Sequence, residues 1–333
     1  MKRIFSGVKP TGHLTLGNYL GAVRRWGEVD QHRADALFSV VDLHALTVEH
    51  DPARVRRLSR QAATLLLAAG LEPERCTLFV QSHVDEHARL SYLMECTATD
   101  GEMRRMIQYK EKSVRARGAG QGVRLSLLTY PALMAADILA YATDEVPVGE
   151  DQTQHVELAR DLAVRFNQRY GRVFTVPEAV NPVVAARVMD LQDPTSKMGK
   201  SHENGAGIVY LLDDADTVRR KVMRAVTDSG REVVYDREER PGVANLVDVL
   251  AAATGCQDPV GLAGAYDSYG ALKKDTAEAV VELLRPVRER HAELAADPAY
   301  VDRVLREGAE RARGMARPVV DAAYRAIGLL PAG

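Results

Sequence analysis

The sequence predicts a protein of the α/β class in which a parallel-sheet domain is followed by an all-helical domain. In the first half of the chain, short apolar runs alternate with longer helical patterns, which favours a parallel sheet. From about residue 206, strand signals become sparse and helical patterns dominate. A length of 333 residues accommodates two domains of modest size.

The expected strands of the first domain cover residues 3–8, 36–41 and 77–81. A helix begins between the last two, because Asp51 suits an N-cap and Pro52 suits the first turn. Apolar residues then recur at helical spacing, at Val55, Leu58, Ala62 and Leu65. Because ligands of such sheets bind at the carboxyl ends of the strands, candidate site residues are expected there.

The second half is expected to be helical over residues 215–226, 243–253, 272–295 and 300–327. The stretch 228–241 between these helices is polar and irregular. The chain shows no internal repeat and no low-complexity tract.

Composition and charge exclude several classes of protein. The 44 basic and 46 acidic residues give a net charge of -2, so any contact with RNA has to come from a local patch. The N-terminus lacks the long apolar region of a secretory signal, and no run approaches the ~18 apolar residues of a membrane span. Cys76, Cys96 and Cys256 are odd in number and far apart, which predicts reduced, buried thiols in a cytoplasmic protein.

Residues 9–19, with the sequence KPTGHLTLGNY, form the first candidate motif. They follow the first expected strand and precede a helix that starts at Asn18. Gly17 allows a ligand to approach the backbone closely. The N-terminus of the helix offers free N–H groups and a positive dipole end to a phosphate. On position alone, an ordinary strand–turn–helix junction explains the segment equally well.

Residues 197–201, with the sequence KMGKS, form the second candidate motif. Lys197 and Lys200 in a glycine-containing loop suit a phosphate chain whose charge moves during a reaction. The last three residues mimic the end of a P-loop, but Pro194 stands where the leading glycine would be required. Taken alone, a lysine-rich loop is usually a solvated surface.

Together, the two motifs resemble the HIGH and KMSKS elements of class I aminoacyl-tRNA synthetases, with TLGN at residues 15–18 standing for the first. Residues 101–112, 130–139 and 146–155 resemble the bacterial, tryptophan-specific members of that family. The resemblance covers nearly the whole chain. It implies activation of L-tryptophan with ATP to Trp-AMP and transfer of tryptophan to tRNA(Trp), in the cytoplasm.

The resemblance also implies an architecture. A Rossmann-like, nucleotide-binding catalytic domain is expected over residues 1–200, with an inserted dimerisation segment at about 80–130. A helical anticodon-binding domain is expected over residues 201–333, with its last helix packing back on the catalytic domain. The protein is expected to be a homodimer with no membrane association.

The chemistry of tryptophan agrees with this assignment. Indole is large and apolar with a single N–H donor, so its pocket needs apolar walls and one buried acceptor. Asp137 stands in an otherwise apolar helical run, where a carboxylate needs a partner. By resemblance, Asp137 accepts the indole N–H. The alternative, that Asp137 caps a neighbouring element of secondary structure, stays open. By resemblance, the apolar walls of the tryptophan pocket are Phe5, Met134, Val146 and Val148. Packing in the hydrophobic core explains each of these residues as well.

The polar end of tryptophan is assigned by resemblance alone. Gln152 and Tyr130 are expected at the α-amino group, and His44 near the carboxylate, although a core histidine explains His44 nearly as well. For ATP, the ribose is expected at Gly149, Glu150 and Asp151. The adenine is expected against Val188. The remaining ATP-binding residues lie in the two motifs: Lys9, Pro10, Thr11, Gly17, Asn18, Lys197, Met198, Gly199, Lys200 and Ser201.

The implied reaction is in-line attack of the tryptophan carboxylate on the α-phosphate, with release of pyrophosphate. The carboxylate is ionised near pH 7, so no general base is required. Catalysis then consists of positioning and charge stabilisation. Mg²⁺ is expected to assist, but we expect no metal site made of protein side chains. The expected catalytic residues are Thr15, Asn18, Lys112, Lys197 and Lys200.

The sequence departs from the family pattern at several places. Lys9 stands where the family usually carries Gln, and we hypothesise that it alters ATP or Mg²⁺ dependence, or sensitivity to tryptophan-like inhibitors. Gly199 replaces the usual Ser of KMSKS. Residues 102–124 hold seven basic and two acidic residues, so they are a candidate RNA-binding patch or, equally, a solvated helix face. The HVDEH sequence at 83–87 matches a metallopeptidase pattern, but five residues weigh little against a resemblance along the whole chain.

Three other functions stay open at this point. A tyrosine-specific synthetase shares the fold and both motifs, but it needs donor and acceptor groups for a phenol hydroxyl. A small-molecule nucleotidyltransferase has no use for the long helical half. A non-catalytic homologue that binds tRNA or tryptophan is disfavoured by the presence of Asn18, Asp137, Lys197 and Lys200.

Overall fold

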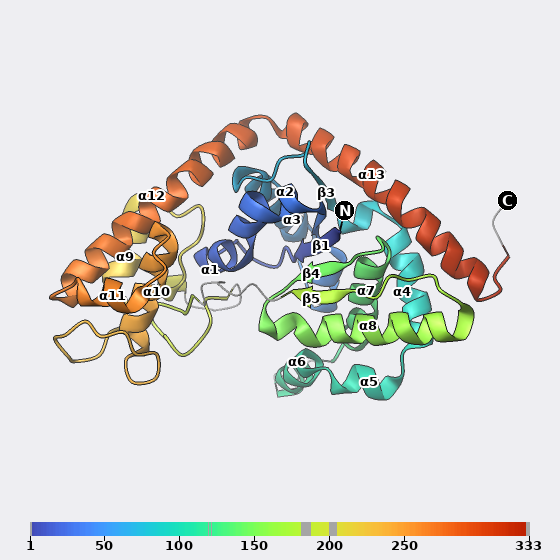
Figure 1. Cartoon of the computed structure of the whole chain (residues 1–333), viewed down its shortest axis with the longest axis horizontal. Coiled ribbons are helices and arrows are strands. Elements are labelled where there is room, and N and C mark those ends of the chain that lie inside the picture. The colour runs from blue at the N-terminus through green and yellow to red at the C-terminus, as the bar shows by residue number, and fades with distance from the viewer. Residues whose placement is uncertain (1, 119, 121, 181–187, 200–204, 331–333) are drawn as a thin grey trace.

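The computed structural model describes residues 2–118, 120, 122–180, 188–199 and 205–330 (Figure 1). Its centre is a parallel five-stranded sheet with the strand order β3-β2-β1-β4-β5. The α/β class predicted from the sequence is confirmed. The strands are β1 (Arg3–Val8), β2 (Asp35–Val40), β3 (Cys76–Val80), β4 (Glu145–Pro147) and β5 (Glu178–Val180).

The register of the central strands brings the carboxyl ends of β1, β2 and β3 to one edge of the sheet. Val8 pairs with Val40, and Val40 pairs with Val80. The three strands expected from the sequence are therefore present within one residue of the expected bounds. Strands β4 and β5 were not predicted, because three residues are too few to show an alternating pattern.

Helix α3 (Pro52–Ala68) connects β2 to β3 and forms as the sequence predicts. The Asp51 carboxylate accepts a hydrogen bond of 3.0 Å from the backbone N–H of Ala53, which caps the free end of the helix. The helix buries Leu58 and Ala62 against the sheet side of the molecule. A crossover helix of this kind places β2 and β3 parallel to each other.

The chain after β1 winds into unusually wide turns. Helix α1 (Leu16–Asn18) is followed by the π-helical segments η1 (Tyr19–Val23) and η2 (Trp26–Asp30) and by α2 (Gln31–Arg33). Thr15 and Asn18 cap each other at the start, since each side chain bonds the backbone N–H of the other. The helix expected from Asn18 onward is present, but residues Tyr19–Val23 form a π-helix.

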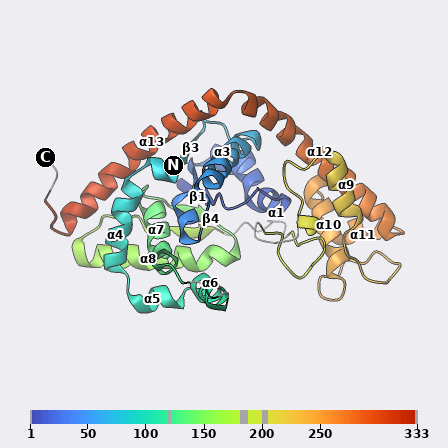
Figure 2. The same cartoon turned by 180° about the vertical axis from the view of Figure 1, so that it is seen from behind.

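Of the helices between β3 and β5, α4, α7 and α8 lie against the second face of the sheet, and α5 and α6 lie outside α7 (Figures 1 and 2). Helix α7 packs against both α4 and α8, and their apolar side chains form a separate core with Phe5, Leu37 and Phe79 of the sheet. Asp85 precedes α4, but its side chain makes no capping hydrogen bond. The helices are α4 (Glu86–Thr97), α5 (Asp100–Arg105), α6 (Ile107–Gly118), α7 (Leu125–Leu139) and α8 (Glu150–Tyr170).

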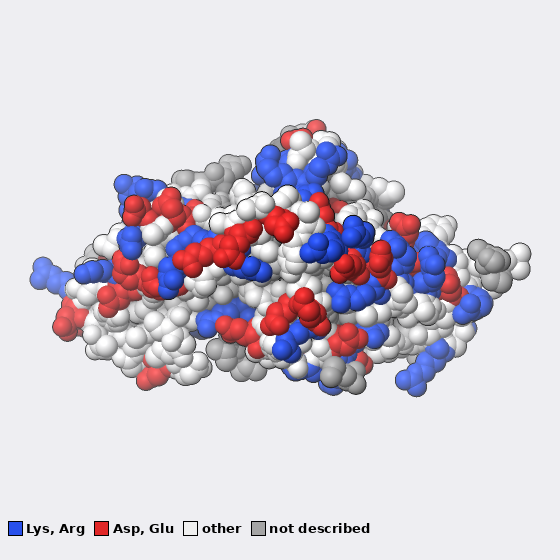
Figure 3. Space-filling model, turned by 90° about the horizontal axis from the view of Figure 1, so that it is seen from above, with Lys and Arg blue, Asp and Glu red and all other residues white. Residues whose placement is uncertain are grey.

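The C-terminal part is helical, as predicted. In Figure 1, α9, α10 and α11 gather at one end of the molecule, and α12 and α13 arch back over the sheet. Acidic and basic side chains are intermixed over this arch when it is seen from above (Figure 3). The helices are α9 (Ala215–Met223), α10 (Pro241–Thr254), α11 (Pro259–Gly264), α12 (Tyr269–Ala296) and α13 (Pro298–Ala326).

Helix α13 returns to the sheet and packs on β3 and α4. A glycine makes the close approach possible, because a Cβ atom at Gly308 would lie 1.8 Å from the carbonyl oxygen of Leu78. Three arginines of α13 reach back to the sheet domain: Arg311 and Arg313 donate to the carbonyl groups of Pro73 and His83, and Arg317 donates to Glu86.

The segment that precedes the second motif is tied to the helical part. The N–H of Met189 donates to Oδ1 of Asn245 (2.9 Å), and Nδ2 of Asn245 donates to the carbonyl of Met189 (3.1 Å). Asn245 lies in α10. The domain boundary expected near residue 200 stays a prediction.

The cysteines differ in part from expectation. Cys76 is buried, but Cys96 is exposed on α4 and Cys256 is partly exposed. The prediction of three buried thiols was therefore wrong for Cys96, because one face of α4 points to solvent. Within the described ranges, no helix is both long and apolar enough to cross a membrane.

Candidate functional site

A cavity of about 320 Å³ opens beside the carboxyl ends of β1 and β2, at the edge where ligands of parallel sheets bind. Helix α7 forms its floor, and residues after β4 close its far side. The cavity is lined by Phe5, Ser6, Gly7, Lys9, Val41, His44, Thr47, Gln108, Lys112, Leu127, Tyr130, Met134, Asp137, Ile138, Val146, Val148 and Gln152.

Every residue that the sequence assigned to tryptophan lines this cavity. The apolar walls are Phe5, Met134, Val146 and Val148, and the polar members are His44, Tyr130, Asp137 and Gln152. Lys9 and Lys112 line it as well. These residues come from five segments that are far apart in the sequence and meet at one edge of the sheet.

The two motifs contact each other through residues that do not line the cavity. The Thr15 hydroxyl donates to the carbonyl of Met198 at 3.4 Å. A Cβ atom at Gly17 would lie 3.1 Å from the same carbonyl oxygen, so a side chain at position 17 would push the motifs apart. The contact places the start of α1 directly against the second motif.

The other residues assigned to ATP have different positions. Pro10, Thr11, Asn18, Gly149 and Lys197 are described but do not line the cavity, and neither does Val188, whose side chain is buried in the core. Lys200 and Ser201 lie outside the described residues, and so do the side chains of Glu150 and Asp151. Gly149 stands at the N-cap of α8.

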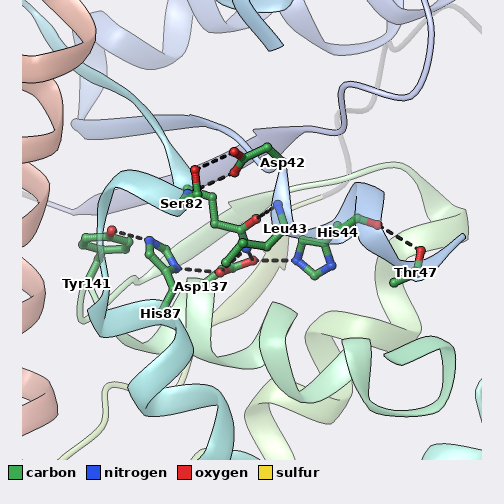
Figure 4. A network of polar contacts seen from close by, with 9 residues as sticks. Asp42, Leu43, His44, Thr47, Ser82, His87, Asp137 and Tyr141 are labelled. Carbon is green, nitrogen blue, oxygen red and sulfur yellow. Dashed lines mark hydrogen bonds and ion pairs between the residues drawn. The ribbon is translucent and has the colours of Figure 1, made fainter. Parts of the chain in front are cut away.

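Asp137 accepts four hydrogen-bond contacts at the floor of the cavity (Figure 4). Its carboxylate is 1% exposed. Oδ1 accepts from Nδ1 of His87 (2.6 Å) and from Nε2 of Gln81 (2.7 Å). Oδ2 accepts from Nε2 of His44 (2.8 Å) and from the same Gln81 nitrogen (2.8 Å). The buried carboxylate thus has the partners that the sequence required of it.

These contacts keep Asp137 ionised. Burial alone would raise the pKa of Asp137, but the charge interactions and hydrogen bonds of His87 and His44 outweigh it and lower the pKa to about 2. The floor of the cavity therefore carries a negative charge near neutral pH.

The ends of β2 and β3 build the support for this carboxylate. Asp42, after β2, accepts hydrogen bonds from the backbone N–H and the hydroxyl of Ser82, after β3. Gln81 accepts from the N–H of Leu43 at 3.0 Å, which turns its amide nitrogen toward Asp137. Segment η3 (Leu43–Thr47) then carries His44 into the cavity.

A second polar group lies at the other end of the cavity. The Tyr130 hydroxyl lies 2.6 Å from Nε2 of His155, and Lys112 donates to Gln108 at 3.0 Å. Lys9 donates to the hydroxyl of Thr47 at 3.2 Å. Burial, followed by the neighbouring Lys112, lowers the pKa of Lys9 to about 8. This end of the cavity is suited to anionic groups.

Sequence reasoning missed several members of the site, above all Gln81, His87 and Tyr141. His87 belongs to the HVDEH sequence, and instead of facing a metal its ring bonds Asp137 and Tyr141. His83 only offers its carbonyl to Arg313. In the part of the chain that the structure describes, no group of three or more His, Cys, Asp and Glu side chains is arranged to hold a metal ion.

Comparisons with known proteins agree with the geometry. The family model described as tRNA synthetases class I (W and Y) matches residues 1–285. The tryptophan–tRNA ligase 1 of Streptomyces coelicolor is 80% identical over 331 residues, which are 99% of this chain and 98% of that protein. The crystal structure of the tryptophanyl-tRNA synthetase of Mycoplasma pneumoniae has a TM-score of 0.91 at 35% identity, covering 99% of this chain and 98% of the other. The enzyme of Campylobacter jejuni, complexed with ADP and tryptophan, has a TM-score of 0.81 at 30% identity, with 98% and 100% covered.

Proposed function

Since this chain belongs to the tryptophan–tRNA ligases of the class I aminoacyl-tRNA synthetase family, we propose that the cavity above Asp137 is its tryptophan site. The enzyme activates L-tryptophan with ATP and transfers tryptophan to tRNA(Trp). The observation that carries the site assignment is the ionised, buried Asp137 at the floor of an otherwise apolar cavity. We propose that it works in the cytoplasm.

Indole matches this cavity in shape and in hydrogen bonding. Its ring needs apolar walls, which Phe5, Met134 and Val146 supply, and its N–H needs one acceptor. Both oxygens of Asp137 already accept two contacts each, which fills the sites of a carboxylate. The indole N–H therefore takes the place of one existing donor.

His44 is the donor that the substrate can replace. Its ring lines the cavity and contacts the Tyr130 ring edge-on at 6.1 Å. Gln81 and His87 are fully buried and do not line it. In our proposal the indole N–H binds Oδ2 of Asp137, and the released imidazole turns to the tryptophan carboxylate. Gln152 and Tyr130 hold the α-amino group.

The anionic groups of the reaction are placed at the lysine end of the cavity. Lys9 and Lys112 line that end. We place the ATP phosphates between it and the joined motifs, with Lys197 and Lys200 on the departing pyrophosphate. Thr15 and Asn18 hold the first motif in place by capping α1. The close approach of Gly17 to the Met198 carbonyl holds the two motifs together.

Activation then needs no proton transfer. The tryptophan carboxylate, already ionised, attacks the α-phosphate in line, and pyrophosphate leaves as Trp-AMP forms. The lysines stabilise the charge that moves to pyrophosphate, and a Mg²⁺ ion bound with the nucleotide would add to this stabilisation. The ribose of ATP lies at Gly149, Glu150 and Asp151, and the adenine on the side of Val188.

Two further proposals concern macromolecular partners, the tRNA and a second subunit. We propose that the helical part binds the anticodon, since α12 and α13 join it firmly to the sheet domain. The basic residues of 102–124 lie on α5 and α6, apart from Arg124 at the N-cap of α7, and their exposed side chains are available to RNA or to a second subunit. We propose a homodimer through the segment at about 80–130.

The test of the proposed site is ATP–pyrophosphate exchange without tRNA, measured for all twenty amino acids. Exchange with tryptophan alone is expected, and Asp137→Asn should lower kcat/KM for tryptophan by at least tenfold, because the amide presents a donor where an acceptor is needed. Exchange with tyrosine instead would overturn the assignment of the cavity. An Asp144→Asn variant, outside the cavity, serves as the control.

A further inference from the structure

We propose that His87 and Tyr141 are positioning residues that hold Oδ1 of Asp137 from the buried side, so that Oδ2 alone exchanges its partner when tryptophan binds. The pair thereby sets the preference for tryptophan over analogues of the same shape that lack an N–H donor. This inference rests on the proposed role of Asp137 as the acceptor of the indole N–H.

The burial of the network divides it into a fixed and an exchangeable side. His87 and Tyr141 are fully buried, and neither lines the cavity. His44 does line it. Figure 4 shows the two histidines on opposite sides of Asp137, with Tyr141 beyond His87. A ligand in the cavity can therefore replace the His44 contact without disturbing the His87 contact.

Asp137 and Tyr141 bind the two ring nitrogens of His87 and so fix the orientation of its ring. An ionised Asp137 can only accept, so Nδ1 of His87 carries the hydrogen of the 2.6 Å bond. Nε2 then accepts the Tyr141 hydroxyl at 2.7 Å. Burial, the charge of Asp137 and the charge of Glu86 all raise the pKa of Tyr141, so that its proton stays in place. Glu86 in turn contacts Arg317 of α13 at 3.3 Å.

Ring packing keeps Tyr141 in position independently of its hydroxyl. Its ring stacks on Phe5 at a centroid distance of 5.6 Å and meets Phe79 at 5.7 Å. Phe5 itself is a wall of the cavity, so Tyr141 lies one layer behind the expected indole. Replacement of Tyr141 by phenylalanine removes one hydrogen bond and leaves these ring contacts available.

A fixed carboxylate discriminates more strongly than a mobile one. An analogue without the N–H displaces His44 but leaves buried Oδ2 of Asp137 with the Gln81 contact alone, which is costly only while the carboxylate cannot turn away. His87 and Gln81 prevent this movement through Oδ1. Without the Tyr141 hydroxyl, the buried Nε2 of His87 loses its partner, so the imidazole is held on one side only and can turn, which loosens its hold on Oδ1 of Asp137.

The experiment compares L-tryptophan with β-(3-benzothienyl)-L-alanine, in which sulfur replaces the N–H, by ATP–pyrophosphate exchange. Tyr141→Phe is expected to lower the ratio of the two kcat/KM values about tenfold and to raise KM for tryptophan, with kcat within about twofold. The control is Tyr324→Phe, which loses a hydroxyl bond to the carbonyl of Arg89 far from the cavity and should keep the wild-type ratio.

The outcomes separate the inference from the proposed function. If Asp137→Asn lowers the ratio but Tyr141→Phe keeps it, the inference is overturned and the role of Asp137 stands. An equal loss for both substrates in Tyr141→Phe also overturns it, since a purely structural role predicts that result. If neither variant changes the ratio, both ideas are wrong. Should Tyr141→Phe not fold, His87→Gln decides by the same readout, because it keeps an amide donor without the tie to Tyr141.

Discussion

Nε2 of His44 lies 2.8 Å from Oδ2 of Asp137, at the boundary between the cavity and the buried core. The contact joins η3 to α7, two segments separated by 93 residues in the sequence. It occupies the acceptor that an indole N–H needs. The structure thus places a side chain where the substrate is expected to bind, and several consequences can be measured.

Removal of this side chain should favour the indole group itself. In His44→Ala, Oδ2 has lost a partner, so the free protein should be destabilised by about 1–3 kcal/mol. Tryptamine carries the indole but no carboxylate, so it gains the vacated acceptor without losing a contact to His44. Calorimetry should show tryptamine binding several-fold more tightly to His44→Ala than to the wild type. Weaker binding would contradict the exchange. His32→Ala, on the surface, should change neither quantity.

The lowered pKa of Lys9 predicts that the stability of the protein depends on pH. Its pKa of about 8 in the folded protein lies below the ~10.4 of an unfolded lysine. Between these pKa values the unfolded chain binds more protons than the folded protein, so the free energy of unfolding rises with pH from about 8. Below pH 8 the full cost of burying the charged ammonium is present. Lys9→Gln should therefore be more stable than the wild type at pH 7, by up to about 3 kcal/mol. Urea unfolding at pH 7 and pH 9.5 should show this difference shrinking.

The control for Lys9 is Lys110→Gln, which replaces an exposed lysine and should give a difference that does not change with pH. A constant difference for Lys9→Gln would show that its ammonium is not penalised by burial. The same variant tests the hypothesis from the sequence. Unchanged ATP and Mg²⁺ dependence, together with unchanged inhibition by tryptophan analogues, would remove any special role of Lys9.

The sequence was sufficient where the signal is local or where a motif is shared with a family. β1 and the capped start of α3 follow from a short apolar run and from Asp51-Pro52. The walls of the cavity followed from resemblance. The support of Asp137 did not, because Gln81 and His87 lie 56 and 50 residues away in the sequence. Nothing in a local pattern distinguishes a histidine that holds a carboxylate from one that binds a metal.

The position of α13 on the sheet depends on one glycine. A Cβ atom at Gly308 would collide with the backbone of Leu78, and this buried backbone, which is paired with β2, cannot yield cheaply. Gly308→Ala should therefore lower the free energy of unfolding by about 2 kcal/mol or more. Gly314→Ala in the same helix meets nothing within 4 Å and should be neutral or stabilising by about 0.5–1 kcal/mol. Equal effects of the two substitutions would argue against the close contact.

The proposed homodimer rests on apolar side chains left in solvent in the segment at about 80–130. Tyr92, Ile107, Val114 and Leu125 are between 56% and 73% exposed, which is unusual for large apolar residues gathered in one segment. A second subunit that covers them would bury this surface. Sedimentation at micromolar concentration should give twice the chain mass of 36.5 kDa, and Val114→Glu with Leu125→Glu should give the single chain. Val260→Glu replaces a valine of nearly equal exposure on α11, 66% against 68% for Val114, and should remain a dimer. A wild-type monomer, or a double variant that still dimerises, would place these side chains outside any interface between subunits.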